Sequence, residues 1–145
     1  MKHFWYLLPL LGMFFLGCAS GSSGSGAAGG RLAACPNSPN CVSSEAADAR
    51  HKVEPFRFNK DAKEALDRLA EIISGMKGGK IVERRDDYIH AVFSSGVFKF
   101  KDDVEFLADP EKGIIHVRSA ARMGYSDFGV NRKRVEKMRN MFEGR

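Results

Sequence analysis

The sequence lacks a hydrophobic run long enough to cross a membrane as a helix. Its sustained apolar stretch extends from Phe4 to Gly17, which is shorter than the roughly 20 residues that a spanning helix needs. Pro9 and Gly12 interrupt this stretch and weaken a permanent membrane helix further. Its length is typical of a signal-peptide core, so residues 1–17 are predicted to be a lipoprotein signal peptide.

Cysteine is scarce, with three residues in the chain. Leu16-Gly17-Cys18 places small residues before a cysteine where the apolar core ends, as in the bacterial lipobox, although Phe15 stands where leucine is usual. We expect Cys18 to be acylated, with simple secretion and an uncleaved anchor as the alternatives. The residues before Cys35, Leu32-Ala33-Ala34, match the lipobox sequence more closely than those before Cys18. However, Arg31 and a polar tract separate Cys35 from the apolar core.

Large side chains are nearly absent from the segment that follows the first cysteine. Residues 18–34 are therefore predicted to be the acylated cysteine and a flexible tether rich in glycine and serine. Ala19 after the modified cysteine resembles lipoproteins of the outer membrane. The predicted location is the cell envelope, with the lipid anchor in the outer membrane and the domain facing the periplasm if the source is Gram-negative. Residues 35–145 form one domain, large enough for its own core.

The chain has no Cys-x-x-Cys pair, which argues against a redox-active site. Cys35 and Cys41 flank two prolines and two asparagines, and in an oxidising compartment this pattern predicts a disulfide that closes a tight loop. Free or metal-bound thiols are the alternative, but only His51 lies near them in sequence. No metal and no cofactor is predicted.

The hydrophobic pattern predicts an α+β domain. Helical spacing of apolar residues between Ala62 and Met76 predicts a first helix, capped at Asn59 and ended by Gly78-Gly79. A second helix is expected to start between Asp127 and Asn131 and to run to Phe142. Its apolar stripe is Val135, Met138 and Phe142.

Between these helices the hydrophobic period changes to two, which predicts strands. Short turns separate four such runs, and short links favour an antiparallel meander. The runs are Lys80 to Arg85, Tyr88 to Ser94, Val97 to Leu107 and Gly113 to Ala120. We therefore expect a four-stranded antiparallel meander with two covering helices, one before and one after the sheet.

Asp102 is the unusual residue of this predicted sheet. The alternation of the third run places Phe98, Phe100 and Val104 on one face, and the same alternation puts Asp102 there too. A buried carboxylate needs a cation or becomes protonated. Arg118 and Arg122 are the candidate partners, and a bulge that turns Asp102 and Asp103 outward is the alternative.

Four motifs, in this order along the chain, carry a resemblance to a known family. They are Cys35-Pro-Asn-Ser-Pro-Asn-Cys41-Val-Ser-Ser, Tyr88-Ile-His90, the run from Phe98 to Phe106 that contains Lys-Asp-Asp, and the run from Arg118 to Arg134. Together they resemble the bacterial and plastid family catalogued as domain of unknown function 1499, over about Cys35 to Phe142. Ala121 departs from the serine that is common in that family. The resemblance implies the fold family and no settled activity, cofactor or substrate.

The run from Arg118 to Arg134 is the candidate functional segment. Residues 118–145 hold eight Lys/Arg against three Asp/Glu, which accounts for the net charge of +5. One interpretation is structural, with the arginines bonding carboxylates and carbonyls of an irregular loop. The acids proposed for such ion pairs are Asp102, Asp103 and Asp127.

A second interpretation is that this segment binds an anion, because a glycine-containing loop that enters a helix presents N–H groups beside arginines. The candidate partners are an anionic small molecule, a lipid headgroup or an acidic face of an envelope protein. The loop lacks the lysine and spacing of a nucleotide P-loop. The candidate ligand-binding residues are Arg118, Ser119, Arg122, Tyr125, Ser126, Asn131, Arg132 and Arg134.

A third interpretation is catalytic, with His90, Asp103 and Ser119 as base, orienting acid and nucleophile of an envelope hydrolase. No nucleophile elbow surrounds Ser119, and His90 and His116 also suit packing between strands. Nucleic acid is not expected as a partner, because of the predicted location. The function predicted first is a non-catalytic, lipid-anchored binding or structural module.

Overall fold

In the described part of the chain the fold combines two helices with a mostly antiparallel sheet, which confirms the α+β class. The computed structural model describes residues 26–59 and 61–145. The central part of the sheet is the expected meander of β5 (Gly79–Arg84), β6 (Tyr88–Ser94), β7 (Lys101–Asp109) and β8 (Ile114–Ala121). The predicted signal peptide and Cys18 lie outside the described residues.

The expectation of four strands is wrong, because the sheet has six strands among the described residues. Two short strands, β3 (Cys41–Ser43) and β4 (Phe56–Arg57), both pair with β8 on the side away from β7. They are too short to show a hydrophobic period, so the sequence gives no sign of them. They bring the segment around the cysteines into the sheet.

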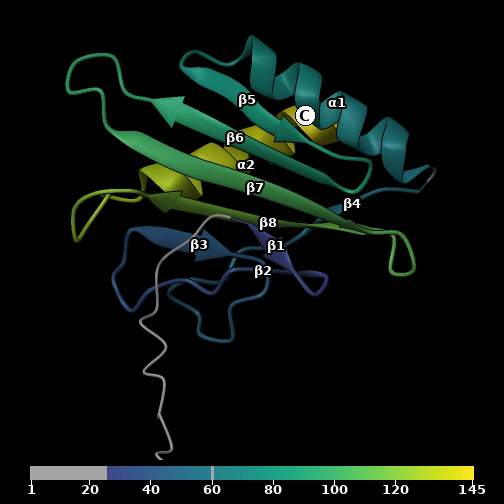
Figure 1. Ribbon diagram of the computed structural model, residues 1–145, viewed down its shortest axis with the longest axis horizontal. Helices are drawn as coiled ribbons and strands as arrows, with labels where there is room; N and C mark the ends of the chain where they lie inside the picture. Colours follow the sequence, from purple (N-terminus) through teal and green to yellow (C-terminus); the bar gives the residue numbers. More distant parts are fainter. Residues whose placement is uncertain (1–25, 60) are drawn as a thin grey trace, which may run out of the picture.

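Both helices cover the same face of the sheet, as Figure 1 shows. α1 (Ala62–Gly75) packs mainly on β5 and β6, and α2 (Val130–Glu143) packs on β8 and β3. The side chain of Asp61, rather than Asn59, caps α1 by accepting hydrogen bonds from the backbone N–H groups of Lys63 and Glu64. A cap of this kind satisfies N–H groups that lack a partner within the helix.

The main core lies between this face and the helices. The predicted stripe of α2 is buried there: Val135 and Met138 are fully covered and Phe142 nearly so. Phe56 sits at its centre, where its ring meets Phe106 edge-on, with the ring centroids 5.5 Å apart. No helix of the described residues is long and apolar enough to span a bilayer.

The opposite face of the sheet is covered by the N-terminal part of the described chain. β1 (Ala27–Ala28) and β2 (Arg31–Leu32) form a small hairpin, and Leu32 packs in a second, smaller apolar cluster with Tyr88 and Leu107. The predicted tether reached residue 34, so its last part is wrong. Leu32 gives the hairpin an apolar anchor that a purely Gly/Ser segment would lack.

The third predicted run starts too early. Its residues Phe98 and Phe100 were expected on the buried face, yet they are 75% and 52% exposed. Residues 95–100 form a loop in which Lys99 has a positive φ of 50°, and β7 begins at Lys101. From Asp102 onward the predicted alternation holds, with Val104 and Phe106 in the core.

Candidate functional site

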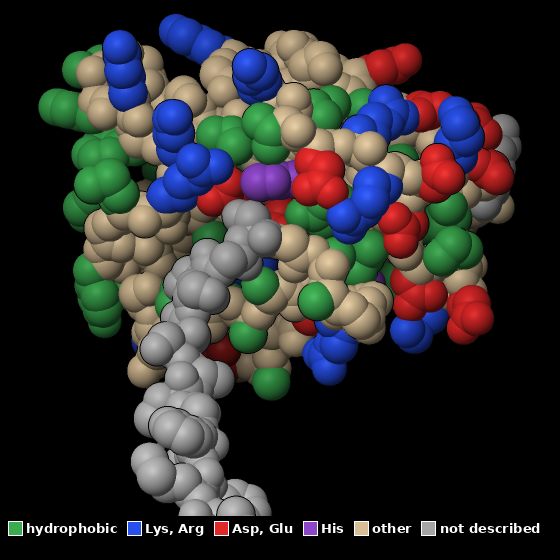
Figure 2. Space-filling model, in the orientation of Figure 1, with side chains coloured by type: hydrophobic (Ala, Val, Ile, Leu, Met, Phe, Trp, Pro, Cys, Tyr) green, Lys and Arg blue, Asp and Glu red, His purple; other side chains and the backbone are tan. Residues whose placement is uncertain are grey.

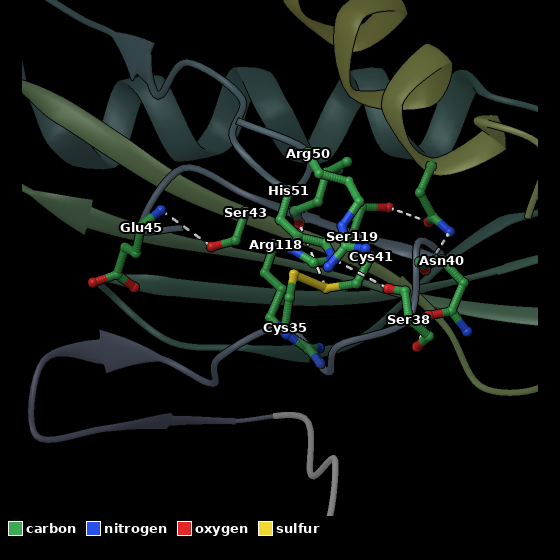
Figure 3. Close-up of a disulfide and its surroundings, with 12 residues drawn as sticks. Cys35, Ser38, Asn40, Cys41, Ser43, Glu45, Arg50, His51, Arg118 and Ser119 are labelled. Atoms are coloured by element: carbon green, nitrogen blue, oxygen red, sulfur yellow. Dashed lines mark hydrogen bonds between the residues drawn. A yellow bond between two sulfur atoms is a disulfide. The ribbon is translucent and has the colours of Figure 1, made fainter. Parts of the chain in front are cut away.

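The disulfide-closed loop forms one wall of a site on the hairpin side of the sheet. Cys35 and Cys41 are joined, as the cysteine spacing predicted. His51 is buried and its Nε2 lies 3.1 Å from the Ser38 carbonyl oxygen, while Asn40 donates from its side chain to the Gly124 carbonyl. The loop is therefore held at Ser38 and at Asn40, and Figure 3 shows it alongside the side chain of Arg118.

Arg118 and Glu105 form a fully buried ion pair beneath this loop. They face each other across β8 and β7, and Arg118 Nη1 donates to Glu105 Oε2 at 3.1 Å. Arg118 is 2% exposed and Glu105 is 0% exposed. In Figure 3 the Arg118 side chain extends toward the hairpin and away from the helices. A buried charge pair needs further hydrogen bonds to offset its loss of hydration.

Glu105 receives those further bonds, whereas Arg118 does not. The Tyr88 hydroxyl donates to Glu105 Oε1 at 2.7 Å, and the Gly26 backbone N–H donates to the same oxygen. Burial, reinforced by the bond to this carboxylate, raises the pKa of Tyr88, so its phenol stays neutral. Arg118 Nε is the one buried side-chain nitrogen or oxygen without a partner in the part of the chain that the structure describes. Such orphaned donors are uncommon and call for an acceptor.

A second charged cluster lies next along the same face. Asp103 accepts two hydrogen bonds from Arg122, both 2.8 Å long, and its Oδ1 lies 2.7 Å from His90 Nε2. Burial opposes ionisation of Asp103, but the bonds from Arg122 and His90 outweigh it and hold the pKa of this carboxyl below its usual range. Asp103 in turn raises the pKa of Arg122. The two stay a charged, bidentate pair.

Both clusters border a pocket of about 490 Å³. Its floor comes from the sheet and one wall from the disulfide-closed loop. It is lined by Pro36, Ser38, Asn40, His90, Asp103, Arg118, Ala120, Ala121 and Arg122. In Figure 2 acidic and basic side chains gather around a histidine on the face shown. The pocket therefore offers two guanidinium groups and an imidazole against one lining carboxylate.

A separate polar network lies on the helix side of the sheet. Asp102 pairs with Arg134 of α2, and the same guanidinium donates to Asn131 Oδ1 at 2.7 Å. Ser119 donates to Asn131 as well, and Asp127 accepts from the Asn131 backbone and side chain. This network joins α2 and the loop before it to the sheet.

The expected partners of Asp102 were wrong. Arg118 and Arg122 contact Glu105 and Asp103, and neither contacts Asp102. The reason is strand alternation: Arg118 points to the face opposite Asp102, and α2 lies directly over the Asp102 face. Asp127 bonds no arginine and instead accepts from the N–H groups of Gly129 and Asn131 at the start of α2.

The eight candidate ligand-binding residues do not converge on one site. Arg118 and Arg122 line the pocket, whereas Ser119, Asn131 and Arg134 lie in the network beneath α2. The remaining three lie elsewhere. Arg132 donates to the carbonyls of Arg50 and Lys52, and Tyr125 and Ser126 are exposed in the loop before α2.

The proposed catalytic set is also divided between the two faces. His90 and Asp103 form a hydrogen-bonded pair, but Ser119 is fully buried on the helix side and bonds Asn131. Ser119 pairs with Val104 in register, which puts it on the opposite face from His90. His116 lies 3.3 Å from the Ser44 hydroxyl and serves packing between β8 and the cysteine segment. The pairing of His90 with Ser119 is therefore wrong.

Three pocket features had no signal in the sequence. Glu105, beneath the pocket, lies on the strand face opposite the apolar one, where its burial had no sequence signal. Asn40 was expected only as a turn-forming residue, and Ser38 was not singled out. Their role depends on residues 26–41 folding back over the sheet, and no local pattern indicates that return. Within the described ranges, no group of three or more His, Cys, Asp or Glu side chains could hold a metal ion.

The fold and the site define a small α+β domain with one sheet face under helices and a charged pocket on the other. The chain belongs to the family described as Protein of unknown function (DUF1499), whose model matches residues 31–142. The match includes both charged clusters and the disulfide-closed loop. No curated protein and no solved structure matches this chain.

Proposed function

We propose that this protein is a lipid-anchored module of the cell envelope that binds an anionic group, a carboxylate or a phosphate, in the pocket beside Arg118 and Arg122. The observation that carries the proposal is the Arg118 guanidinium, which is buried and has an unsatisfied Nε donor. A buried cation with spare donors is costly unless an acceptor reaches it. An anion in the pocket that Arg118 lines would help to neutralise this guanidinium.

The neighbouring groups suit a small oxyanion. Arg122 presents a planar guanidinium that already binds one carboxylate in bidentate fashion, and its side chain is 43% exposed. Asn40 adds a neutral polar side chain from the loop wall. Oxyanions prefer such forked donors, and a partly enclosed site strengthens the attraction. The ligand class therefore includes small carboxylates, phosphate esters, lipid headgroups and acidic protein segments.

The experiment is isothermal titration calorimetry at low ionic strength with inorganic phosphate, sulfate, acetate and citrate as probes. The test variant is Arg122→Gln. Arg84→Gln is the matched control, because Arg84 is also 43% exposed and also pairs with an aspartate, on the far edge of the sheet. We expect saturable binding of at least one probe, weakened about tenfold or more in Arg122→Gln, which equals about 1.4 kcal/mol, and unchanged in Arg84→Gln.

The proposal fails if no probe gives saturable heat, or if both variants bind as the parent does. Binding that disappears equally in both variants indicates a non-specific charge effect and also rejects the site.

The lipid anchor is a separate part of the proposal. We place it on Cys18, in the outer membrane and facing the periplasm if the source is Gram-negative. Mass spectrometry of the mature chain from membranes is expected to show an acylated N-terminal Cys18, and Cys18→Ser is expected to abolish the acyl mass. An unmodified chain that begins elsewhere would reject the anchor and leave the pocket untouched.

A hydrolase is the second candidate, and one observation favours it. His90 Nε2 and Asp103 Oδ1 are 2.7 Å apart, so an acid orients an imidazole at the edge of the pocket. Ser38 is a hydroxyl in the same pocket, but it donates to Asn40 Oδ1 at 2.7 Å. Turnover of chromogenic esters and phosphate esters that His90→Gln abolishes in a folded protein would favour this candidate. Binding without turnover favours the binding module.

A further inference from the structure

Large hydrophobic side chains are exposed together at one end of the molecule. They lie on two loops, residues 95–100 between β6 and β7 and residues 122–129 between β8 and α2. The loops are neighbours, because Asp102 pairs with Ala121 and the Arg122 N–H donates to the Lys101 carbonyl at 3.0 Å. We call these loops the apolar end. Its exposed members are Val97, Phe98, Phe100, Met123, Tyr125 and Phe128.

The exposure is too large and too concentrated for an ordinary surface. Phe128 is 89% exposed, Phe98 75% and Tyr125 71%. Both loops extend beyond the sheet at the same end in Figure 1, and Figure 2 shows hydrophobic side chains gathered there. Phe98 and Phe100 contact each other, with ring centroids 5.7 Å apart, and not the core. Clustered exposed aromatics of this kind mark an interaction surface.

The charges at the apolar end are mostly positive. Lys99 and Lys101 are exposed beside the aromatic rings, and Arg122 starts the second loop. Asp127 is the acid of the two loops, and it is occupied by the N–H groups of Gly129 and Asn131. Aromatic rings flanked by lysines are typical of segments that sit at the headgroup level of an anionic membrane.

The geometry of the chain also suits a membrane at this end. Gly26 bonds Glu105 near the middle of β7, and Cys18 precedes it by eight residues. A chain of that length reaches at most about 28 Å. Four residue steps along β7, from Glu105 to Lys101, span about 13 Å. A lipid on Cys18 and the apolar end can therefore lie in the same bilayer surface.

We propose that the apolar end binds the surface of an anionic lipid bilayer, with Phe98, Phe100 and Phe128 inserted among the headgroups and Lys99 and Lys101 against lipid phosphates. This contact is additional to the proposed acyl anchor and does not depend on the anion pocket. It gives the domain a fixed orientation on the membrane, whereas a flexible tether alone would let the domain rotate freely.

The test uses a single tryptophan as a reporter in the mature chain. The chain's one tryptophan is Trp5, in the predicted signal peptide, so Phe98→Trp introduces a unique fluorophore in the mature protein. Val82→Trp is the control, because Val82 is 50% exposed on β5, the far edge strand. Vesicles are phosphatidylcholine alone or an equal mixture with phosphatidylglycerol, each with and without brominated lipid.

With the anionic vesicles, we expect the Phe98→Trp emission to shift to shorter wavelength and to be quenched by brominated lipid. The Val82→Trp emission should do neither. Adding Lys99→Glu and Lys101→Glu to Phe98→Trp should remove the shift, whereas adding Lys137→Glu, an exposed lysine on α2, should leave it.

Three results would overturn the proposal. Emission from position 98 that stays fully exposed and unquenched with anionic vesicles means that the apolar end does not touch the membrane. Equal quenching at positions 82 and 98 means that the domain has no preferred orientation. A blue shift without vesicles that rises with protein concentration assigns the surface to a second copy of the chain. The mass of the N-terminal cysteine, measured on the same sample, reports on the acyl anchor independently.

Discussion

Two neighbouring residues on β7, Asp102 and Asp103, show how the two faces of the sheet differ. Strand alternation sends them to opposite sides, and each meets an arginine from a later part of the chain. Asp102 lies under α2 with Arg134 and Asn131, where the groups satisfy one another. Asp103 lies at the edge of a pocket with Arg122 and His90.

The difference lies in what each side leaves unsatisfied. Among the described residues, no buried polar side-chain atom of the helix-side network lacks a hydrogen bond, whereas the pocket side contains the unpaired Nε of Arg118. The helix-side network, in which every buried polar side-chain atom is hydrogen-bonded, holds α2 to the sheet and needs no ligand. The pocket side has an arginine with an unused hydrogen-bond donor. Arginine–carboxylate pairs therefore connect secondary-structure elements on one face and form a candidate binding surface on the other.

The largest expected effect is on stability, from Arg118→Met. Glu105 is fully buried, and loss of its cation leaves an uncompensated charge, which costs about 4 kcal/mol of unfolding free energy. Urea denaturation followed by circular dichroism measures this loss. Adding Glu105→Gln should recover part of it, since the orphaned charge is then removed. A loss below about 1 kcal/mol for Arg118→Met would contradict a tightly coupled buried pair.

Arg134→Met tests the other face. We expect a loss of about 3 kcal/mol, slightly less than for Arg118, because the Asp102 and Arg134 side chains are each 12% exposed. The affinity for the anionic probe should not change in the folded variant, because Arg134 does not line the pocket. A large change in affinity would show that the two faces are coupled and would remove the distinction between them.

The disulfide should affect both stability and binding. Replacing Cys35 and Cys41 together with serine is expected to cost about 2 kcal/mol, as the chain-entropy model gives for so small a ring. Ser38 and Asn40 would then lose their restraint, so the anion affinity should fall as well. Equal affinity in the double variant, measured by the same calorimetry, would mean that the loop wall takes no part in binding.

The smallest effect is a change in acid sensitivity. Because the folded-state pKa of Asp103 is depressed, its contribution to stability is present above its unfolded pKa of about 3.9 and is lost as pH falls through the folded value. The parent should therefore lose melting temperature more steeply than Asp103→Asn between about pH 5 and pH 2. Parallel curves would show that Arg122 and His90 do not stabilise the ionised form.

Some elements were predictable because their signals are local. The bounds of β6 agree with the predicted run from Tyr88 to Ser94, and the buried stripe of α2 agrees with its helical spacing. β7 was predicted to start too early, because the alternation of Phe98 and Phe100 continues outward through a loop where no helix covers them. The alternation of apolar residues does not show where the helices that cover the strand end.

The candidate site was less predictable than the fold. The sequence pointed to the arginines, yet only two of the eight candidate ligand-binding residues, Arg118 and Arg122, line the pocket. The hairpin and the disulfide-closed loop bury the face of β7 that lies opposite the helices. That covering depends on contacts such as Gly26 with Glu105, separated by 79 residues.

The sequence by itself determined the α+β class, the disulfide and the face on which each residue of β7 lies from Asp102 onward, because these follow from spacing along a short stretch of chain. Only the tertiary structure decided which arginine meets which acid. Alternation assigns a side chain to a face, but its partner depends on which distant segment packs there. Arg134 reaches Asp102 because α2 crosses that face, and Arg118 meets Glu105 on the other face, which residues 26–41 cover.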